Sequence, residues 1–420
     1  MRSFWQIFWL ETIGIIRSKT LLMLMVASVG WMLVFPVLAR GDGTAEGARE
    51  LYIHYSLGGV FLLLVIALLA AATGAVARER AEKRLQLTLV RPVRYFSVVF
   101  GKMLAYVMAG AVVLAISSVV LCFEVGGLGT RCSHVLSPVL PTPAEEAKAM
   151  YEVYMSDPET PAEVKRTKKE IVLRLLTQRA LDHYQTIPTN EVVAWQFPDS
   201  GESDGLKVRM RFTNPMEMRQ DVIGRFSYRG LVGVVSNMTQ AVLEVPLTGS
   251  IRETEPAELK FLNGSTSALM LRPRKDINIL VPADAFWANL ARAYLEMTAI
   301  LALVIAFGVF LSAALGRPVA LFTAIVVLLV SEMSPSVVSQ YPDELETNML
   351  DRIGLHVARA AAELTHPVSA LTPLEALSKD ECIDPCEVCR VLVLDLVAVP
   401  VFLALLAALV MPRKQEDAQI

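Results

Sequence analysis

The chain has 420 residues, of which 54% are apolar and only 19% charged, and its mean hydropathy is +0.47. This profile is typical of a membrane protein and excludes an ordinary soluble domain. The net charge of -3 says little about partners, because the charges are partitioned between the two sides of the apolar segments. We expect a lipid membrane and no nucleic acid as partners, no cleavable signal peptide and no lipid anchor.

Residues 1–20 predict an amphipathic helix in the membrane interface. Trp5, Phe8 and Trp9 would face the apolar side, and Arg17 and Lys19 would face water. The alternative is a helical extension of the first span.

Six apolar segments follow, each near the ~20 residues that cross the hydrocarbon core as a helix. They lie roughly at 21–39, 56–77, 103–123, 294–315, 318–333 and 391–411. The fifth is the shortest, so it would also fit a tilted or re-entrant helix.

The basic residues of the short connections set the expected orientation. They gather in the N-terminal segment, in 78–102, at Arg317 and in the tail at Arg413 and Lys414. Short loops rich in Lys and Arg lie on the cytoplasmic side, so both termini would be cytoplasmic, in an inner (cytoplasmic) membrane.

The two long inserts would then be extracytoplasmic. In the first, 142–185 has helical spacing, with Pro161 at a first-turn position. Alternating runs follow at 191–197, 206–213, 224–231, 241–247, 257–263 and 277–282, as in an antiparallel sandwich.

The predicted fold is an α-helical integral membrane protein with six spans and an inserted α+β, β-sandwich-like extracytoplasmic domain. The expected divisions are the interface helix 1–20, spans 1–3 in 21–124, the outer domain 125–290, spans 4–5 in 291–333, a helical outer segment 334–389, and the last span with its tail 390–420.

The connection 78–102, which we call the elbow, is more organised than a simple tether. It is strongly basic and contains a leucine run, a Pro-Val-Arg turn and a Gly-Lys pair where the third span begins. An ordinary positive-inside loop is the alternative reading.

These features resemble the permease subunits of ABC-2 type ABC transporters, and among them the permeases associated with multicopper enzyme maturation. Glu11, the Arg17-Ser18 pair and the Gly316-Arg317-Pro318 turn also resemble that family. One departure is Lys83-Arg84, where many members have Gly-Thr.

The resemblance implies that the elbow is a coupling helix that docks on a separate ABC ATPase subunit. The implied coupling residues are Glu79, Arg80, Lys83, Arg84, Leu87, Leu89, Pro92, Arg94, Gly101 and Lys102. The chain has no G-x-x-x-x-G-K-[ST] phosphate loop, so nucleotide chemistry would belong to the partner, with a homodimer or a second permease completing the transporter.

Four cysteines would lie on the oxidising outer side: Cys132, Cys382, Cys386 and Cys389. One or two disulfides are the expected use, and metal or thiol handling is the alternative. The five histidines show no ligand spacing, so we predict no metal site and no cofactor.

Glu296, Glu332 and Asp395 fall near the outer ends of the last three spans. They would either snorkel and pair with Arg292 or Arg390, or form a polar mouth of a translocation path.

The predicted function is therefore an ATP-driven exporter permease without catalytic residues of its own. The alternative is a non-transporting mechanotransmitter or scaffold whose outer domain binds a protein. A membrane enzyme is the weakest reading, because the sequence has no H-E-x-x-H or G-x-S-x-G motif. A bundle without buried ion pairs would favour a lipid, peptide or hydrophobic cargo.

Overall fold

A computed structural model describes residues 2–38, 45–82, 94–125, 131–158, 167, 169–181, 183–199, 205–213, 220–239, 241–252, 255–340, 354 and 372–416. The chain divides into two compact units. The helical unit comprises Met1–Arg40, Arg49–Thr130 and Ala285–Ile420, and the β-rich unit comprises Gly41–Ala48 and Arg131–Asp284.

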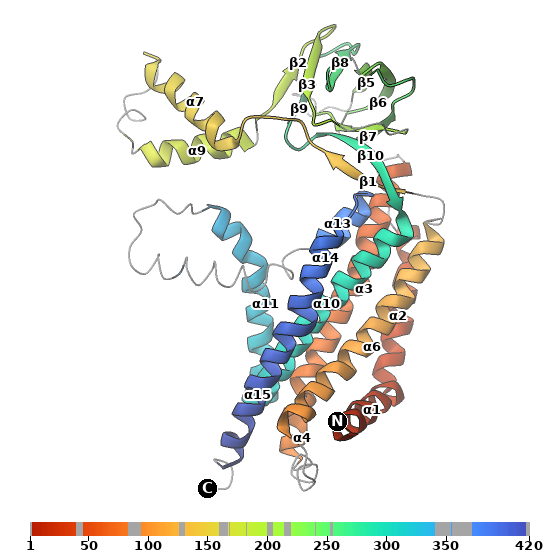
Figure 1. Ribbon diagram of the computed structural model, residues 1–420, viewed down its shortest axis with the longest axis vertical. Coiled ribbons are helices and arrows are strands. Elements are labelled where there is room, and N and C mark those ends of the chain that lie inside the picture. The colour runs from red at the N-terminus through yellow and green to blue at the C-terminus, as the bar shows by residue number, and fades with distance from the viewer. Residues whose placement is uncertain are drawn as a thin grey trace. The chain divides into compact units, whose positions relative to one another are not determined.

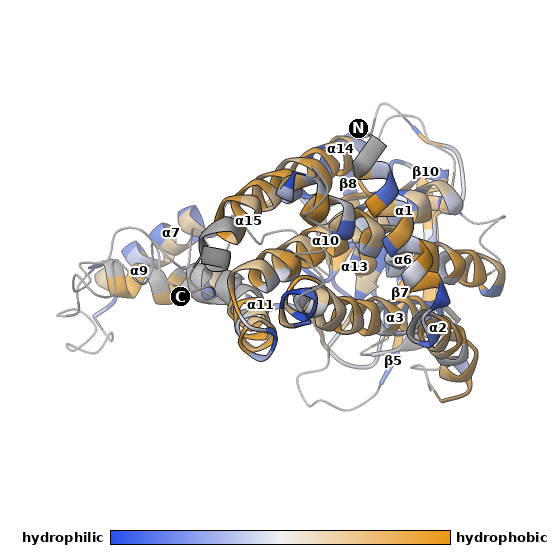
Figure 2. Cartoon of the chain, turned by 90° about the horizontal axis from the view of Figure 1, so that it is seen from below, coloured by the Kyte–Doolittle hydropathy of each residue, from blue (hydrophilic) through white to orange (hydrophobic). Residues whose placement is uncertain are grey.

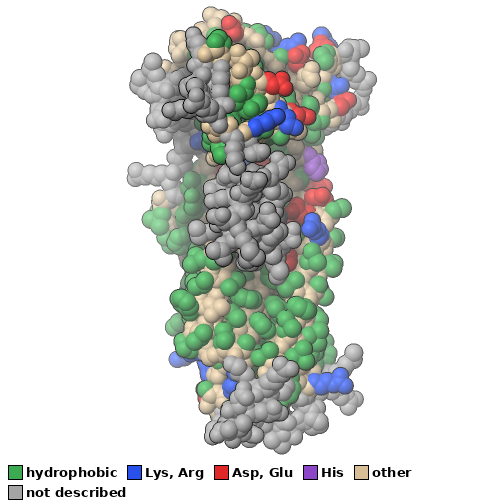
Figure 3. All heavy atoms as spheres, turned by 90° about the vertical axis from the view of Figure 1, so that its left-hand side faces the viewer, with side chains coloured by type: hydrophobic (Ala, Val, Ile, Leu, Met, Phe, Trp, Pro, Cys, Tyr) green, Lys and Arg blue, Asp and Glu red, His purple; other side chains and the backbone are tan. Residues whose placement is uncertain are grey.

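The helical unit is built from long apolar helices joined by short ones (Figure 1). Its elements are α1 (Arg2–Arg17), α2 (Lys19–Leu38), α3 (Ala45–Ala75), α4 (Ala77–Ala81), α6 (Tyr95–Glu124), α10 (Phe286–Ala314), α11 (Arg317–Gln340), α13 (Thr372–Ser378), α14 (Pro385–Val391), the π-helix η1 (Leu392–Ala398) and α15 (Val399–Glu416). The long helices are predominantly hydrophobic when viewed along the bundle (Figure 2). On the face shown in Figure 3, hydrophobic side chains cover the middle of this unit.

Among the described residues, four helices are long and apolar enough to cross a membrane: Gly47–Ala81, Tyr95–Glu124, Phe286–Ala314 and Pro385–Met411. The pair Phe4–Arg17 and Leu22–Leu38, bent by 59°, would add a fifth span. The predicted span 318–333 falls on α11, whose apolar part Arg317–Val330 is shorter. The described residues therefore give a multi-pass protein with four or five spans, and the sixth span stays a prediction.

Helix α10 is the centre of the helical unit. In its most apolar stretch 83% of the residues are buried, against 22% in Pro385–Met411. Glycines let its neighbours approach closely: a Cβ on Gly110 of α6 would lie 2.3 Å from Leu301 Cδ2 and 2.7 Å from Leu68 Cδ1. Small residues at such crossings allow the dispersion contacts that hold helices together in lipid.

The last span changes its helical winding where it meets a proline. Pro400 has no N–H to donate and its ring crowds the preceding turn, so a regular α-helix cannot run through this point undisturbed. Residues Leu392–Ala398 adopt a π-helix immediately before it, which widens the turn.

The described residues of the β-rich unit form ten strands: β1 (Arg131–Leu136), β2 (Gln185–Ile187), β3 (Val192–Gln196), β4 (Lys207–Arg211), β5 (Asp221–Tyr228), β6 (Leu231–Met238), β7 (Val242–Pro246), β8 (Glu258–Asn263), β9 (Leu269–Leu271) and β10 (Ile277–Ala285). They form sheets of order β1-β10-β4-β7 and β3-β8-β5-β6, with a two-stranded β2-β9 pair. The β-rich domain predicted from the sequence is present.

One core joins the two larger sheets. It contains Val208 and Leu243 from one sheet and Phe226 and Phe261 from the other. The rings of Phe226 and Phe261 lie 4.7 Å apart between centroids. The alternating runs noted in the sequence arise because inward-facing side chains fill this core, as the burial pattern of β5 illustrates.

The run 224–231 was read as a single strand, and this reading is wrong. The chain turns at Arg229 and Gly230, which have φ of 48° and 82°, and returns as β6. Two positive φ values make a tight hairpin turn, which usually has Asn or Asp first. Arg229 takes that place, and its side chain donates to Asp199 at 2.5 Å.

The described part of the β-rich unit also contains the helices α7 (Pro143–Ser156) and α9 (Lys169–Leu181). Helix α7 begins at Pro143, after a capping box in which Thr142 and Glu145 bond each other's backbone N–H groups. These hydrogen bonds hold the pKa of Glu145 below its ordinary value. The expected helix start at Pro161 lies outside the described residues.

We predict that Glu244→Gln weakens the β-rich unit above pH 5 and removes part of its acid sensitivity. Glu244 on β7 lies opposite Arg209 on β4, whose Nη2 is 2.7 Å from its Oε1. Burial opposes ionisation, but Arg209 and Lys207 hold the pKa of Glu244 below its ordinary 4.5. The ion pair therefore stabilises the β-rich unit at pH values above the pKa that Glu244 has in the unfolded chain. This stabilisation is lost as the pH falls through the pKa that Glu244 has in the folded chain.

The expected loss is about 1–2 kcal/mol, because the hydrogen bonds involve charged groups that are largely buried. Hydrogen exchange of β4 and β7 amides in the full chain, measured by mass spectrometry between pH 7 and pH 3, would report it. Glu258→Gln is the matched control, since Glu258 faces an exposed Lys260 at 3.4 Å. Equal acid sensitivity in Glu244→Gln and the native chain would contradict a stabilising role for the Glu244–Arg209 pair.

Candidate functional site at the elbow

The elbow begins where α3 ends, and its first turn is fixed to α10. Backbone N–H groups of Val76 and Ala77 both donate to Ser312 Oγ, at 3.0 Å each. Arg80 of α4 donates to the carbonyl of Ala313. The regular helix is interrupted at Val76, between α3 and α4, and the end of α10 supplies a partner for these N–H groups.

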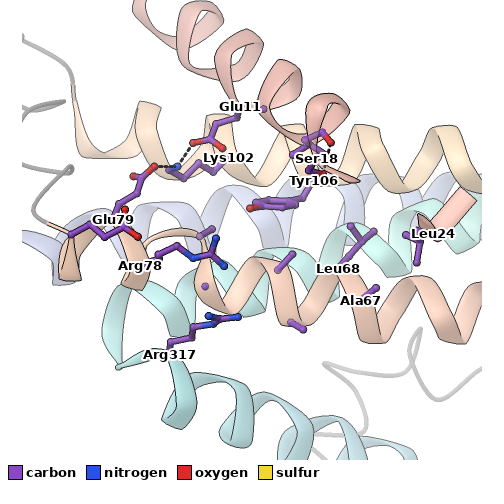
Figure 4. A pocket seen from close by; sticks show the side chains of 17 residues that line it. Glu11, Ser18, Leu24, Ala67, Leu68, Arg78, Glu79, Lys102, Tyr106 and Arg317 are labelled. Atoms are coloured by element: carbon purple, nitrogen blue, oxygen red, sulfur yellow. Dashed lines mark hydrogen bonds and ion pairs between the residues drawn. The ribbon is translucent and has the colours of Figure 1, made fainter. Parts of the chain in front are cut away.

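A buried lysine joins three further elements. Lys102 of α6 donates to Glu11 of α1 and to Glu79 of α4, the latter at 2.7 Å (Figure 4). Lys102 is 3% exposed, whereas Glu11 and Glu79 are 19% and 29% exposed. We call these three residues the Lys102 cluster.

The physical reason for the cluster is the cost of burying an ammonium. Removing a charge from water costs several kcal/mol unless an opposite charge and hydrogen bonds replace the lost solvation. Two carboxylates surround Lys102, so the cluster holds α1, α4 and α6 together as a unit. The expectation of a bundle without buried ion pairs is therefore wrong at this end of α6.

Residues next to the cluster explain why α1 can lie so near α6. A Cβ on Gly101 would lie 3.2 Å from Ile7 Cγ2 and 3.5 Å from the Phe8 backbone nitrogen. Phe4 stacks on Phe100 with ring centroids 5.8 Å apart. The Gly-Lys pair thus has two roles: Gly101 permits the close crossing, and Lys102 fixes it.

The opposite face of α1 is apolar and open. Trp5 and Trp9 are 60% and 62% exposed, and Ile13 and Ile16 are also exposed. Apolar exposure on one face and Glu11 on the other fit a helix that lies in the membrane interface.

Of the predicted coupling residues, the structure brings Glu79, Arg80, Gly101 and Lys102 together at this junction. Arg94 lies apart from their contacts, exposed at the N-cap of α6. Lys83, Arg84, Leu87, Leu89 and Pro92 lie outside the described residues.

Two participants were not predicted as site residues. Glu11 could have been identified from the sequence, since it is the single acid in an amphipathic, aromatic-rich helix. Ser312 gave no signal, because a serine in an apolar helix more often bonds its own backbone.

A cavity of about 690 Å³ opens beside the Lys102 cluster. Small residues of α3, among them Ala67, Ala71 and Gly74, form one wall, and Arg78, Tyr106 and Arg317 also line it (Figure 4).

Two of the predicted polar positions in the spans are buried. Glu296 of α10 is 6% exposed and Asp395 of η1 is 4% exposed. Within the described part of the chain, Glu296 Oε1 and Asp395 Oδ2 have no hydrogen-bond partner. Snorkelling to the interface therefore does not describe these acids, and the side chain of Glu332 lies outside the described residues.

The cysteines fall into two states. Cys132 and Cys382 are disulfide-bonded. Cys386 and Cys389 of α14 are free and exposed, and Cys122 of α6 is free and half-buried. Among the described residues, no group of three or more His, Cys, Asp or Glu side chains could hold a metal ion.

We predict that Lys102→Met loosens α1 from α6, because it leaves Glu11 and Glu79 without their cation in a largely apolar setting. Removing one member of a buried pair costs about 3–5 kcal/mol, and partial exposure of both acids should reduce this to about 2 kcal/mol. Limited proteolysis at Arg17 and Lys19, followed with the full chain in nanodiscs, would detect it. Lys102→Arg should keep the native pattern, and Lys102→Met with Glu11→Gln should recover part of the protection. Unchanged cleavage in Lys102→Met would show that the cluster does not hold α1.

Residues 7–140 match the family model described as ABC-2 family transporter protein. Comparison with curated proteins and with solved structures finds no match. The match runs from α1 through the elbow to the end of α6 and just beyond, and so contains Glu11, Glu79 and Lys102. The narrower resemblance to permeases of multicopper enzyme maturation is not tested by it and stays a prediction. Over residues 7–140, about a third of the chain, the protein is thus similar to the ABC-2 family of transporters, whose permeases in general work with a separate ATPase.

Proposed function

We propose that this chain is the permease subunit of an ATP-driven exporter, and that the elbow transmits the movement of a separate ATPase to the spans. The observation that carries the proposal is the attachment of the elbow's two described ends. Glu79 and Arg80 tie its start to α6 and α10, and Lys102 ties its return to α1.

This attachment supports a lever mechanism. A segment held at both stems moves its neighbouring helices when it is displaced, whereas a flexible loop absorbs the displacement. Closure of two ATPase subunits would push on the elbow, and α3, α6 and α10 would tilt with it. Substrate would then move along the interface between two permeases.

Within this mechanism the predicted coupling residues divide into two groups. Lys83, Arg84, Leu87, Leu89, Pro92 and the exposed Arg94 would meet the ATPase, with the cations steering association to an acidic groove. Glu79, Arg80, Gly101 and Lys102 would act as positioning residues, since Lys102 in particular is buried.

The same proposal includes the topology predicted from the sequence. It has six spans in an inner membrane, cytoplasmic termini and an extracytoplasmic β-rich domain. The domain boundaries would fall at residues 20, 124, 290, 333 and 389. Basic residues in the elbow and tail support this orientation. The disulfide-bonded state of Cys132 and Cys382 supports an oxidising location for both.

A partner permease is supported by the surface of the last span. Phe402, Leu405 and Leu409 of α15 are 59%, 50% and 69% exposed. This face would contact lipid or a second permease, in a homodimer or a heterodimer.

The alternative function is a mechanotransmitter that moves no cargo. The β-rich unit favours it, because such a device needs a large outer surface for a protein partner. ATP-driven flux in reconstituted vesicles would support the exporter, and ATP hydrolysis controlled only by an outer protein would support the alternative.

We expect this chain to co-purify with a phosphate-loop ATPase. The double variant Arg84→Glu with Arg94→Glu should weaken that complex at least tenfold, because two cations that attract an acidic groove on the ATPase are replaced by carboxylates that it repels. Affinity capture of the tagged chain with quantification of bound ATPase would measure it. Arg211→Glu, an exposed change on β4, is the control. Retention of the ATPase and of ATP-driven activity in the double variant would overturn the coupling assignment.

The orientation predicts that single cysteines at positions 83 and 211 react from opposite sides of the membrane. Lys83→Cys and Arg211→Cys would be made with the free Cys386 and Cys389 replaced by serine. An impermeant maleimide added to intact cells should label position 211 and should reach position 83 only after permeabilisation. Labelling of both from the same side would contradict the proposed topology.

A further inference from the structure

The cavity beside the Lys102 cluster has an apolar side and a cationic side. Ala67, Leu68 and Ala71 of α3 and Leu24 of α2 make the apolar side. Arg78 of α4 and Arg317 of α11 make the cationic side, and Figure 4 shows both guanidinium groups directed toward the space between these helices.

The two arginines meet at one glycine. A Cβ on Gly74 would lie 3.2 Å from Arg317 Nε and 3.6 Å from Arg78 Nη2. A glycine at this point of α3 therefore makes room for both guanidinium groups, since an added Cβ would crowd Arg317 and would lie in ordinary van der Waals contact with Arg78.

Neither guanidinium group makes an ion pair or a hydrogen bond within the described part of the chain, and both arginines are exposed and line the cavity. The acids lining the cavity are Glu11, Glu79 and the exposed Glu82. Lys102 already holds the first two. Two cations placed side by side repel each other, so the arrangement is stabilised by an anion between them.

A phosphate is the anion that this arrangement favours. Guanidinium groups bind phosphate oxygens with paired, charge-assisted hydrogen bonds. The apolar wall continues away from the arginines along α3, an apolar helix long enough to cross the membrane, so a ligand that fills the cavity needs a phosphate at one end and a hydrocarbon chain at the other.

We propose that this cavity binds one anionic phospholipid, with the headgroup phosphate between Arg78 and Arg317 and an acyl chain against Ala67, Leu68 and Ala71. Basic pockets between spans at the membrane boundary are known to hold such headgroups. The lipid fills the space between α1, α3 and α11, beside the Lys102 cluster. The proposal rests on the membrane-spanning helices and does not depend on the ATPase partner.

Native mass spectrometry of the full chain released from nanodiscs tests the proposal. The nanodiscs contain phosphatidylcholine with a minor fraction of phosphatidylglycerol. The native chain should retain one phosphatidylglycerol, and Arg78→Gln with Arg317→Gln should reduce retention by about tenfold per arginine. Arg94→Gln, an exposed arginine that does not line the cavity, should retain the lipid. Equal retention in the double variant and the native chain would overturn the proposal.

Gly74→Ala keeps the test decisive if the double variant fails to fold. Alanine favours a helix over glycine, so thermal stability should stay equal or rise. Retention should fall, because the new Cβ would lie 3.2 Å from Arg317 Nε and would shift that guanidinium group by a few tenths of an ångström. Unchanged retention in this variant would mean that the two guanidinium groups do not form the binding site.

The source of the phosphate is decided by two further measurements. Excess inorganic phosphate should leave the bound lipid in place, and Ala67→Leu, which fills the apolar wall, should lower lipid retention. Displacement by inorganic phosphate together with unaltered retention in Ala67→Leu would identify a soluble phosphate site and would overturn the lipid assignment.

Discussion

A single buried ammonium organises the end of the helical unit that carries the elbow. Lys102 lies in a predominantly apolar helix, and its charge is tolerated because Glu11 and Glu79 approach it from two other helices. Those carboxylates cannot move away without leaving the ammonium unsolvated. The relative positions of α1, α4 and α6 are therefore coupled by electrostatics, and not by packing alone.

Packing and backbone hydrogen bonds act together with this cluster. Gly101 lets α1 approach the backbone of α6, and Ser312 accepts two N–H groups where α3 gives way to α4. The elbow thus starts from a rigid junction whose parts belong to four different helices. Under the proposed function, such a junction would pass a displacement of the elbow into the spans.

The buried acids Glu296 and Asp395 differ from this arrangement, because each has an oxygen without a partner among the described residues. Asp395 also lies in the π-helical turn that precedes Pro400. Ionisable residues inside membrane spans often mark functional sites, and the polar mouth of a translocation path stays a prediction for these two helices. The carboxylates of the Lys102 cluster are ion-paired, whereas one oxygen of each of these buried acids has no hydrogen-bond partner in the described part of the chain.

Features that depend on residues close together in the chain could be predicted from the sequence. These are the classification as a membrane protein, the apolar segments, the basic elbow and most strands. Hydropathy runs report the length of a span, and alternation reports one buried face of a strand. The ABC-2 resemblance likewise depends on short motifs. The turn at Arg229 and Gly230 was missed because a basic residue seldom takes a positive φ there.

Contacts between distant residues were decided only by the tertiary structure. Lys102 reads in sequence as a basic residue beside a span, and its burial between Glu11 and Glu79 depends on how three helices cross. The same holds for Ser312, for the two arginines at Gly74, and for the choice of Cys132 and Cys382 as the disulfide-bonded cysteines. Local sequence sets the type and length of each element, but the free energy of a buried charge depends on which side chains the fold brings to it.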